Sequence, residues 1–202
     1  MIKKRGRLFV LSGPSGTGKG TVCRHIAVRG EIEISVSATT RAPRKNESDG
    51  VSYYFISREE FLQRIAEDAF LEYAEVYGNF YGTPKAPLQK KLLAGIDVVL
   101  EIDMQGALKV KEKEPEAVLI YLLPSSLAEL RKRLTGRGTE TEDAVEMRLS
   151  KTREELACLP YYDYFVVNDE LEAALADVRA IIRAEHHRVR NLSEELIRSL
   201  EK

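Results

Sequence analysis

Four short runs of apolar residues stand out along the chain as candidate buried strands. They are 8-LFVLS-12, 98-VVLEI-102, 117-AVLIYLL-123 and 164-YFVVN-168. A run that is apolar on both faces is typical of a parallel strand covered by helices on each side. Segments with helical signals lie between these runs, at 19–29, 84–94, 105–113 and 127–134. Pro84 suits a first helical turn, and Ser126 and Glu129 form a capping pair. The alternation predicts an α/β fold with a doubly wound parallel sheet.

The segment 31–82 departs from this alternation. It holds an alternating apolar run over 32–36, a polar loop, and aromatic stretches on either side of a helix that begins at the capping pair Ser57 and Glu60. Alternation of apolar and polar positions indicates strands with one solvated face. We expect a small mixed or antiparallel sheet with one helix here.

A second departure covers 135–157. It opens with 136-GRG-138 and continues into a helix predicted to begin at the capping pair Thr139 and Glu142. A glycine-flanked arm that carries arginines is more typical of a mobile lid than of a core element. The last segment, 170–202, has the pattern of a charged amphipathic helix.

Composition narrows the class of protein. With 202 residues, 44% hydrophobic and 31% charged, the chain suits one globular unit with small insertions. Its formal net charge of −1 predicts no general attraction to nucleic acid or to a membrane surface. Residues 1–30 do hold seven Lys or Arg and no acidic residue, and we interpret 3–7 as a solvated basic tail.

The cellular location is predicted from the cysteines and the N-terminus. Cys23 and Cys158 match no metal or disulfide spacing, so we expect buried thiols in a reducing compartment. The apolar run 8–11 is too short for the core of a signal peptide, and no segment approaches membrane-spanning length. The expected location is the cytoplasm.

The stretch 12-SGPSGTGKGT-21 follows the first predicted strand and opens the first predicted helix. Gly13, Gly18 and Lys19 fit the P-loop pattern of Gly, four residues, Gly, Lys and Ser or Thr, whereas Gly20 stands at the hydroxyl position. In such a loop, backbone N–H groups and the positive end of the helix bind phosphate oxygens, and the lysine adds a mobile charge. The alternative is a glycine-rich turn that only connects a strand to a helix. The strand–loop–helix context favours a phosphate site.

The glycine at position 20 changes the expected arrangement of a metal ion. Because Mg²⁺ readily keeps several waters, we expect nucleotide phosphates and water to hold it. The hydroxyl of Thr21 is predicted to contact a donor phosphate. Asp103, just after the strand 98–102, is the carboxylate predicted to orient metal-bound water. The alternative for Asp103 is an N-cap of the following helix.

Six segments, in order across nearly the whole chain, resemble guanylate kinases: 13-GPSGTGKGT-21, 35-SVSATTRAPR-44, 69-AFLEYAEVYGNFYGT-83, 101-EIDMQG-106, 133-RLTGRGTE-140 and 167-VND-169. That family transfers the γ-phosphoryl group of ATP to GMP, with Mg²⁺, and gives ADP and GDP. The resemblance implies a single unit made of a P-loop core, a GMP-binding subdomain and a helical lid. The core would comprise 1–34, 84–134 and 158–202, the subdomain 35–83, and the lid 135–157.

The resemblance also implies site residues. For ATP they are the loop and one residue expected near adenine: Gly13, Pro14, Ser15, Gly16, Thr17, Gly18, Lys19, Gly20, Thr21 and Asn168. For GMP they are Ser37, Arg41, Arg44, Tyr53, Glu72, Tyr81, Thr83 and Glu101. The implied catalytic residues are Lys19, Arg41, Arg133, Arg137 and Arg148. We expect dGMP to be an acceptor as well.

The chemistry of these residue types agrees with those roles. Two guanidiniums three residues apart, at Arg41 and Arg44, can grip one phosphate. Guanine presents N1–H and a 2-amino group side by side, and one carboxylate, here Glu72, accepts both. Adenine has an acceptor at N1, so the same carboxylate would reject it. Arginines brought in by a lid would neutralise charge on the transferred phosphoryl group and exclude water. Arg131, Lys151 and Arg153 we interpret as a solvated helix face.

Two other functions are compatible with the same fold. One is a non-catalytic interaction module that binds peptides, but such modules lose the phosphate loop, which is intact here. The other is a kinase for a different nucleoside monophosphate or a small phosphorylated sugar. Glu72, Ser37 and Thr83 argue against the second alternative.

Overall fold

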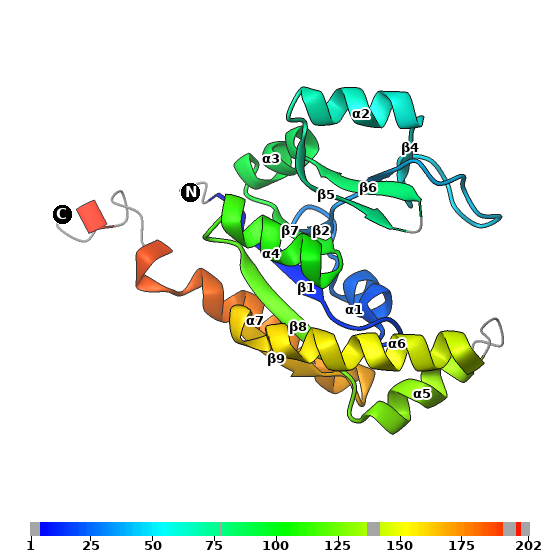
Figure 1. Ribbon diagram of the computed structural model, residues 1–202. Helices are drawn as coiled ribbons and strands as arrows, with labels where there is room; N and C mark the ends of the chain where they lie inside the picture. Colours follow the sequence, from blue (N-terminus) through cyan, green and yellow to red (C-terminus); the bar gives the residue numbers. More distant parts are fainter. Residues whose placement is uncertain (1–4, 77, 137–141, 192–196, 199–202) are drawn as a thin grey trace.

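The computed structural model describes residues 5–76, 78–136, 142–191 and 197–198 (Figure 1). A five-stranded parallel sheet forms the centre, in the order β2-β7-β1-β8-β9. Its strands are β1 (Leu8–Ser12), β2 (Ile32–Ile34), β7 (Asp97–Glu101), β8 (Val118–Leu123) and β9 (Tyr164–Val167). The four strands predicted from apolar runs are all present, to within one residue at each end.

Helices cover both faces of this sheet, as a doubly wound fold requires. Phe9 and Leu11 of β1 point into a core shared with α1 (Lys19–Ile26) and α7 (Leu171–His186). Leu8 and Val10 point into the opposite core, shared with α3 (Lys85–Leu93) and α4 (Met104–Lys113). The central strand is therefore buried on both faces, which explains its unbroken apolar run.

A second, four-stranded sheet lies beyond α4, at the top of Figure 1. Its order is β4-β3-β6-β5, and the pairing is mixed: β3 is parallel to β4 and antiparallel to β6, which is antiparallel to β5. The strands are β3 (Ala38–Thr39), β4 (Tyr54–Phe55), β5 (Phe70–Val76) and β6 (Asn79–Pro84). One helix, α2 (Arg58–Ala66), packs on it through Phe61, whose ring stacks on Phe70 with centroids 4.4 Å apart. The predicted cap is confirmed, since Ser57 Oγ accepts from the N–H of Glu60 at 3.1 Å.

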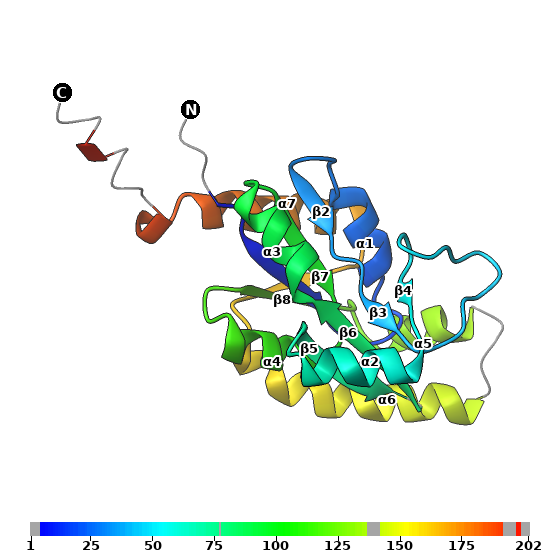
Figure 2. The same cartoon turned by 90° about the horizontal axis from the view of Figure 1, so that it is seen from above.

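The apolar alternation predicts that 32–36 belongs to this small sheet, which is wrong for β2, although the bounds implied by the resemblance put 32–34 in the core. Ile32–Ile34 pairs in parallel with β7, at the edge of the central sheet. Ile32 and Ile34 pack on the α1/α7 core, and their strand is only half-buried. An edge strand covered on one face alternates in the same way as a strand of a solvated antiparallel sheet. Figure 2 follows the chain from β2, beside α1, into β3 of the second sheet.

The segment predicted as a lid, 135–157, and the end of the predicted core before it contain two packed helices in the described part of the chain. They are α5 (Leu127–Thr135) and α6 (Glu142–Glu155), and a 3₁₀ turn, η1 (Leu156–Tyr161), follows. The cap of α5 is confirmed by a 3.0 Å bond from the N–H of Glu129 to Ser126 Oγ. Leu130 and Leu134 of α5 form a small core with Val145 and Leu149 of α6. The predicted cap at Thr139 and the predicted catalytic Arg137 lie outside the described residues.

Two further expectations need correction. The helix expected over 170–202 ends at His186, and a 3₁₀ turn, η2 (Val189–Asn191), follows. Cys23 is buried as expected, but Cys158 is only half-buried because it lies on the 3₁₀ turn η1 outside the central cores. In the parts of the chain described above, no helix combines the length and hydropathy needed to span a membrane.

Candidate active site

The glycine-rich loop joins β1 to α1. Asn168, directly after β9, contacts it. Gly18 is the N-cap of α1 with φ of 89°, a left-handed conformation that favours glycine. A Cβ at Gly18 would also lie 2.6 Å from the side-chain amide of Asn168. That amide donates to the carbonyl of Thr17 at 2.7 Å, and Asn168 is 6% exposed. Asn168, the residue predicted to touch adenine, therefore packs against the loop backbone and stabilises the conformation of the loop.

Lys19 begins α1 and turns back over the loop. Its ammonium group donates to the carbonyls of Gly13 at 2.6 Å and Pro14 at 2.9 Å. Burial lowers the pKa of Lys19, and the nearby carboxylate of Glu101 acts in the opposite direction. The positive charge and the helix N-terminus thus meet at one place, as a phosphate site requires.

The space beside Gly20 is occupied by a carboxylate. A Cβ at this position would lie 3.1 Å and 3.3 Å from the two carboxylate oxygens of Glu101, and 3.5 Å from an Arg24 nitrogen. Burial raises the pKa of Glu101, while Lys19 and Arg24 lower it. Glu101 therefore lies on the phosphate side of the site, next to the position where other P-loops carry a hydroxyl.

Asp103 lies on the other side of the site. It is the N-cap of α4, and its Oδ1 accepts from the N–H of Gly106 at 2.8 Å, so the capping alternative is confirmed. A Cβ at Gly106 would lie 3.4 Å from this Asp103 oxygen and 3.1 Å from Oε2 of Glu72. The carboxylates of Asp103 and Glu72 thus both lie close to Gly106, in the part of the site that is nearest the small sheet.

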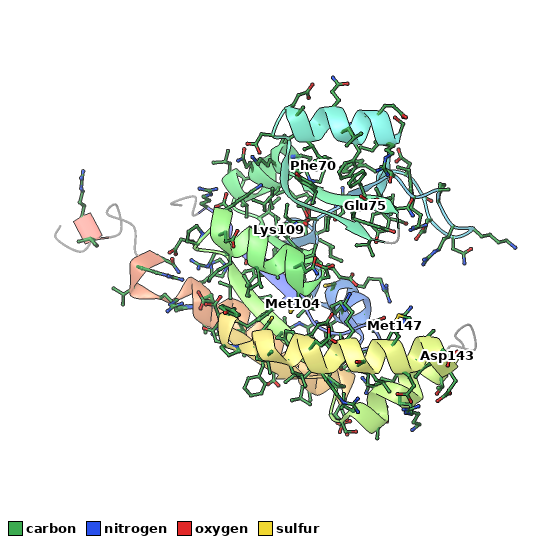
Figure 3. All side chains as sticks on the ribbon, viewed as in Figure 1. Phe70, Glu75, Met104, Lys109, Asp143 and Met147 are labelled. Carbon is green, nitrogen blue, oxygen red and sulfur yellow. The ribbon has the colours of Figure 1, made fainter. Side chains whose placement is uncertain are left out.

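Glu72 is a buried carboxylate on β5, 5% exposed. Thr83 of β6 donates to its Oε1 at 2.6 Å. Burial raises the pKa of Glu72, the Thr83 hydrogen bond lowers it, and Asp103 raises it further. Lys109 of α4, labelled in Figure 3, donates to the carbonyl of Tyr73 at 2.8 Å and so ties β5 to the central domain.

A cavity of about 240 Å³ joins these groups. Its polar lining comes from the loop, from the small sheet and from the residues after β7. These lining side chains are Lys19, Ser37, Tyr53, Glu72, Tyr81, Glu101 and Asp103. The loop lysine at the start of α1 and the buried carboxylate on β5 therefore line the same cavity.

Tyr53 and Tyr81 line this cavity, and the loop between β3 and β4 carries Arg41 and Arg44. The rings of Tyr53 and Tyr81 lie edge to face, 6.0 Å apart. The guanidinium of Arg41 lies over the ring of Tyr53, with its central carbon 5.6 Å from the ring centroid. Arg44 follows on the same exposed loop, and its backbone N–H donates to Glu47 at 2.8 Å. The structure thus places both arginines and both tyrosines in one region.

The arginines of the lid have different surroundings. Arg148 of α6 donates to the hydroxyl of Ser15 at the tip of the loop. Arg133 of α5 donates to Glu129 at 3.0 Å, and to the backbone carbonyls of Asn168 at 2.8 Å and Asp169 at 3.3 Å. Arg148 therefore faces the phosphate loop, whereas Arg133 holds α5 on the end of β9.

Arg131 is partly exposed, as expected of a solvated helix face, and it also forms ion pairs. It pairs with Glu142 at 2.7 Å and also with Glu146, both on α6. With the apolar contacts between α5 and α6, this pairing makes the two helices one unit.

Comparisons with known proteins agree with this geometry. The guanylate kinase family model matches residues 5–185. The chain belongs to the guanylate kinase family. It is 52% identical over 198 residues to a guanylate kinase of Clostridium perfringens, across 98% of this chain and 92% of that protein. It is 51% identical over 196 residues to one of Halalkalibacterium halodurans, across 96% of both chains. The crystal structure of guanylate kinase from Anaplasma phagocytophilum superposes with a TM-score of 0.80 at 36% identity, across 100% of this chain and 97% of that one.

Within this guanylate kinase fold, sequence reasoning missed two groups. Glu47 forms an ion pair with Arg41, and the only hint in the sequence was an acidic residue close to two arginines. Gly106 contacts two carboxylates of the cavity, and its only hint was a glycine in a helix, where glycine is unfavourable.

Proposed function

We propose that this protein transfers the γ-phosphoryl group of ATP to GMP by in-line displacement, and that dGMP is a second acceptor. One observation carries the proposal: the P-loop lysine and a buried carboxylate suited to guanine line the same cavity. Because Mg²⁺ readily keeps several waters, we propose that nucleotide phosphates and water hold it.

The donor site is the loop 13–21. Its backbone N–H groups and the N-terminus of α1 bind the phosphates of ATP, and Lys19 moves from the loop carbonyls to the phosphate oxygens. Arg148, next to Ser15, adds positive charge at the transferred group. Asn168 acts by holding the loop rather than by touching adenine.

We assign the metal ion to the part of the site where Glu101 lies. Glu101 thus takes over the role of orienting metal-bound water that was predicted for Asp103. The carboxylate of Glu101 lies beside Gly20 and Lys19, so it is the better placed group to orient metal-bound water. Bound Mg²⁺ would neutralise charge on the phosphates. Thr21 keeps its predicted contact with a donor phosphate.

The acceptor site is formed by the small sheet and the start of α4. Arg41, Arg44, Tyr53 and Tyr81 bind the phosphate of GMP. Glu72 accepts from guanine N1–H and the 2-amino group, and Asp103 lies close enough to Glu72 to accept from the same amino group. Ser37 and Thr83 contact the base near O6.

Selectivity against adenine follows from the buried carboxylate. Adenine offers an acceptor at N1 and no 2-amino group, so Glu72 would lose its partners while buried. None of the residues assigned to the acceptor site reads the ribose 2′-hydroxyl, which supports dGMP as an acceptor. We also propose a cytoplasmic location and small-molecule substrates rather than nucleic acid, as the sequence predicted.

The roles are tested by steady-state kinetics with GMP, dGMP, AMP and UMP as acceptors. Lys19→Ala should abolish turnover with every acceptor. Glu72→Gln should lower kcat/KM for GMP at least tenfold, about 1.4 kcal/mol, and leave the KM for ATP unchanged. Full GMP selectivity in Glu72→Gln would contradict the assignment of base reading.

A further inference from the structure

The carboxylate of Glu47 lies among the groups assigned to the phosphate of GMP. It belongs to the loop between β3 and β4, three residues after Arg44 and six after Arg41. Its Oε1 accepts from Nη2 of Arg41 at 2.9 Å, and its Oε2 accepts from the backbone N–H of Arg44 at 2.8 Å. Both side chains of the ion pair are largely covered, with 17% of Arg41 and 18% of Glu47 exposed.

Glu47 is held by its own turn. Its backbone N–H donates to the carbonyl of Arg44 at 3.0 Å while its side chain accepts from the N–H of the same residue. The two bonds close a compact turn and use Oε2, and the Arg41 guanidinium uses Oε1. If the side chain moved away, the N–H of Arg44 would lose its acceptor, so the carboxylate is a fixed part of the loop.

The ion pair fixes the orientation of Arg41. Nη1 donates to the carbonyl of Ala42 at 2.7 Å, and the guanidinium lies over the ring of Tyr53. The hydrogen bond with Glu47 is the main cause that raises the pKa of Arg41, and the Tyr81 hydroxyl also raises it. One side of the guanidinium is thus anchored in the loop, and the rest of it contacts the rings of Tyr53 and Phe55 and the hydroxyl of Tyr81.

We propose that Glu47 is a positioning residue, which holds Arg41 and the Arg44 turn in the shape that receives the GMP phosphate. An arginine that is already oriented loses less conformational freedom when it binds a phosphate, and this raises affinity. The inference rests on the proposed role of Arg41. The competing hypothesis is that Glu47 is an internal competitor, which the phosphate must displace from Arg41.

The two hypotheses predict opposite effects of Glu47→Gln. The amide oxygen can replace only one of the two acceptors, so a positioning role predicts a KM for GMP raised about tenfold. Glu47→Ala, which removes both acceptors, should raise it further. The KM for ATP and the inhibition constant of guanosine, which has no phosphate, should change less than about twofold. An internal competitor predicts a lower KM for GMP.

Controls separate this inference from the proposed function. Glu60→Gln removes another paired carboxylate, which lies 2.6 Å from Arg64 on α2, the helix that packs on the small sheet. It should leave both KM values and the inhibition constant of guanosine unchanged. Arg41→Ala should raise the KM for GMP, and Glu47→Gln should then add less than about twofold. If Arg41→Ala raises the KM but Glu47→Gln leaves it unchanged or lowers it, the positioning role is overturned. If Arg41→Ala has no effect, the phosphate site itself is wrong.

Discussion

The substitution Gly106→Ala should weaken recognition of guanine without a large loss of stability in α4. The new Cβ would lie 3.1 Å from Oε2 of Glu72 and 3.4 Å from Oδ1 of Asp103, while Ile102 lies 3.3 Å away. The Glu72 carboxylate and the Ile102 side chain would have to move by a few tenths of an ångström, whereas Asp103 would be in ordinary contact. Ala is favoured over Gly in a helix by up to about 1 kcal/mol, and this preference offsets part of the cost of those movements. The free energy of unfolding should therefore not fall by more than about 1 kcal/mol.

Binding of GMP should nevertheless weaken in this variant. A hydrogen bond to a charged group contributes about 1.5–3 kcal/mol, and a displaced Glu72 would lose part of it, which predicts a KM for GMP raised about tenfold. The assay is urea unfolding together with initial rates at varied GMP and varied ATP. Glu112→Ala, on the exposed face of α4, is the control and should leave both constants unchanged. A stable Gly106→Ala variant with the wild-type KM for GMP would refute the proposed contact between the glycine and the guanine-binding carboxylates.

Four other predictions follow from contacts of buried groups. Asn168→Ala removes the amide that holds the Thr17 carbonyl, so titration should show ATP binding weakened about tenfold, with GMP binding unchanged. Burial raises the pKa of Glu72. As the solution is acidified, wild-type affinity for GMP should therefore begin to fall at a higher pH than it would with an ordinary carboxyl group of pKa about 4.5. Glu72→Gln should abolish that pH dependence. The same shift predicts that Glu72→Gln unfolds at a higher urea concentration than wild type near pH 7, because the buried charge costs stability above its unfolded-state pKa. Glu185, fully buried and paired with Arg7 at 3.2 Å, should cost about 3–5 kcal/mol of unfolding free energy when changed to Ala, with kcat unchanged at low temperature.

The three inner strands β7, β1 and β8 were predictable because they are buried on both faces, and the phosphate loop because its spacing is distinctive. β2 was not, since a strand covered on one face has the same alternation whether it lies at the edge of a parallel sheet or in a small antiparallel one. Only the pairing of Ile32–Ile34 with β7 distinguishes the two arrangements.

The sequence predicted that Glu101 contacts GMP and that Asp103 orients metal-bound water, and the proposed function exchanges these two roles. Two residues apart in a continuous strand, the two carboxylates would point to the same side. The chain instead leaves β7 after Glu101 and begins α4 with Asp103 as its N-cap. That turn directs one carboxylate toward the phosphate loop and the other toward Glu72. Similarly, the spacing of Arg41 and Glu47 gives no sign of their pairing, because it depends on the turn between them.

The most direct test of the account follows a labelled phosphoryl group. ATP labelled with ³²P at the γ-position is incubated with Mg²⁺ and an equimolar mixture of GMP and AMP, and the products are separated by chromatography. The account predicts that the label appears in GDP, with none in ADP. Label recovered mainly as inorganic phosphate, or in ADP formed from AMP, would contradict phosphoryl transfer to a guanine-selective acceptor site.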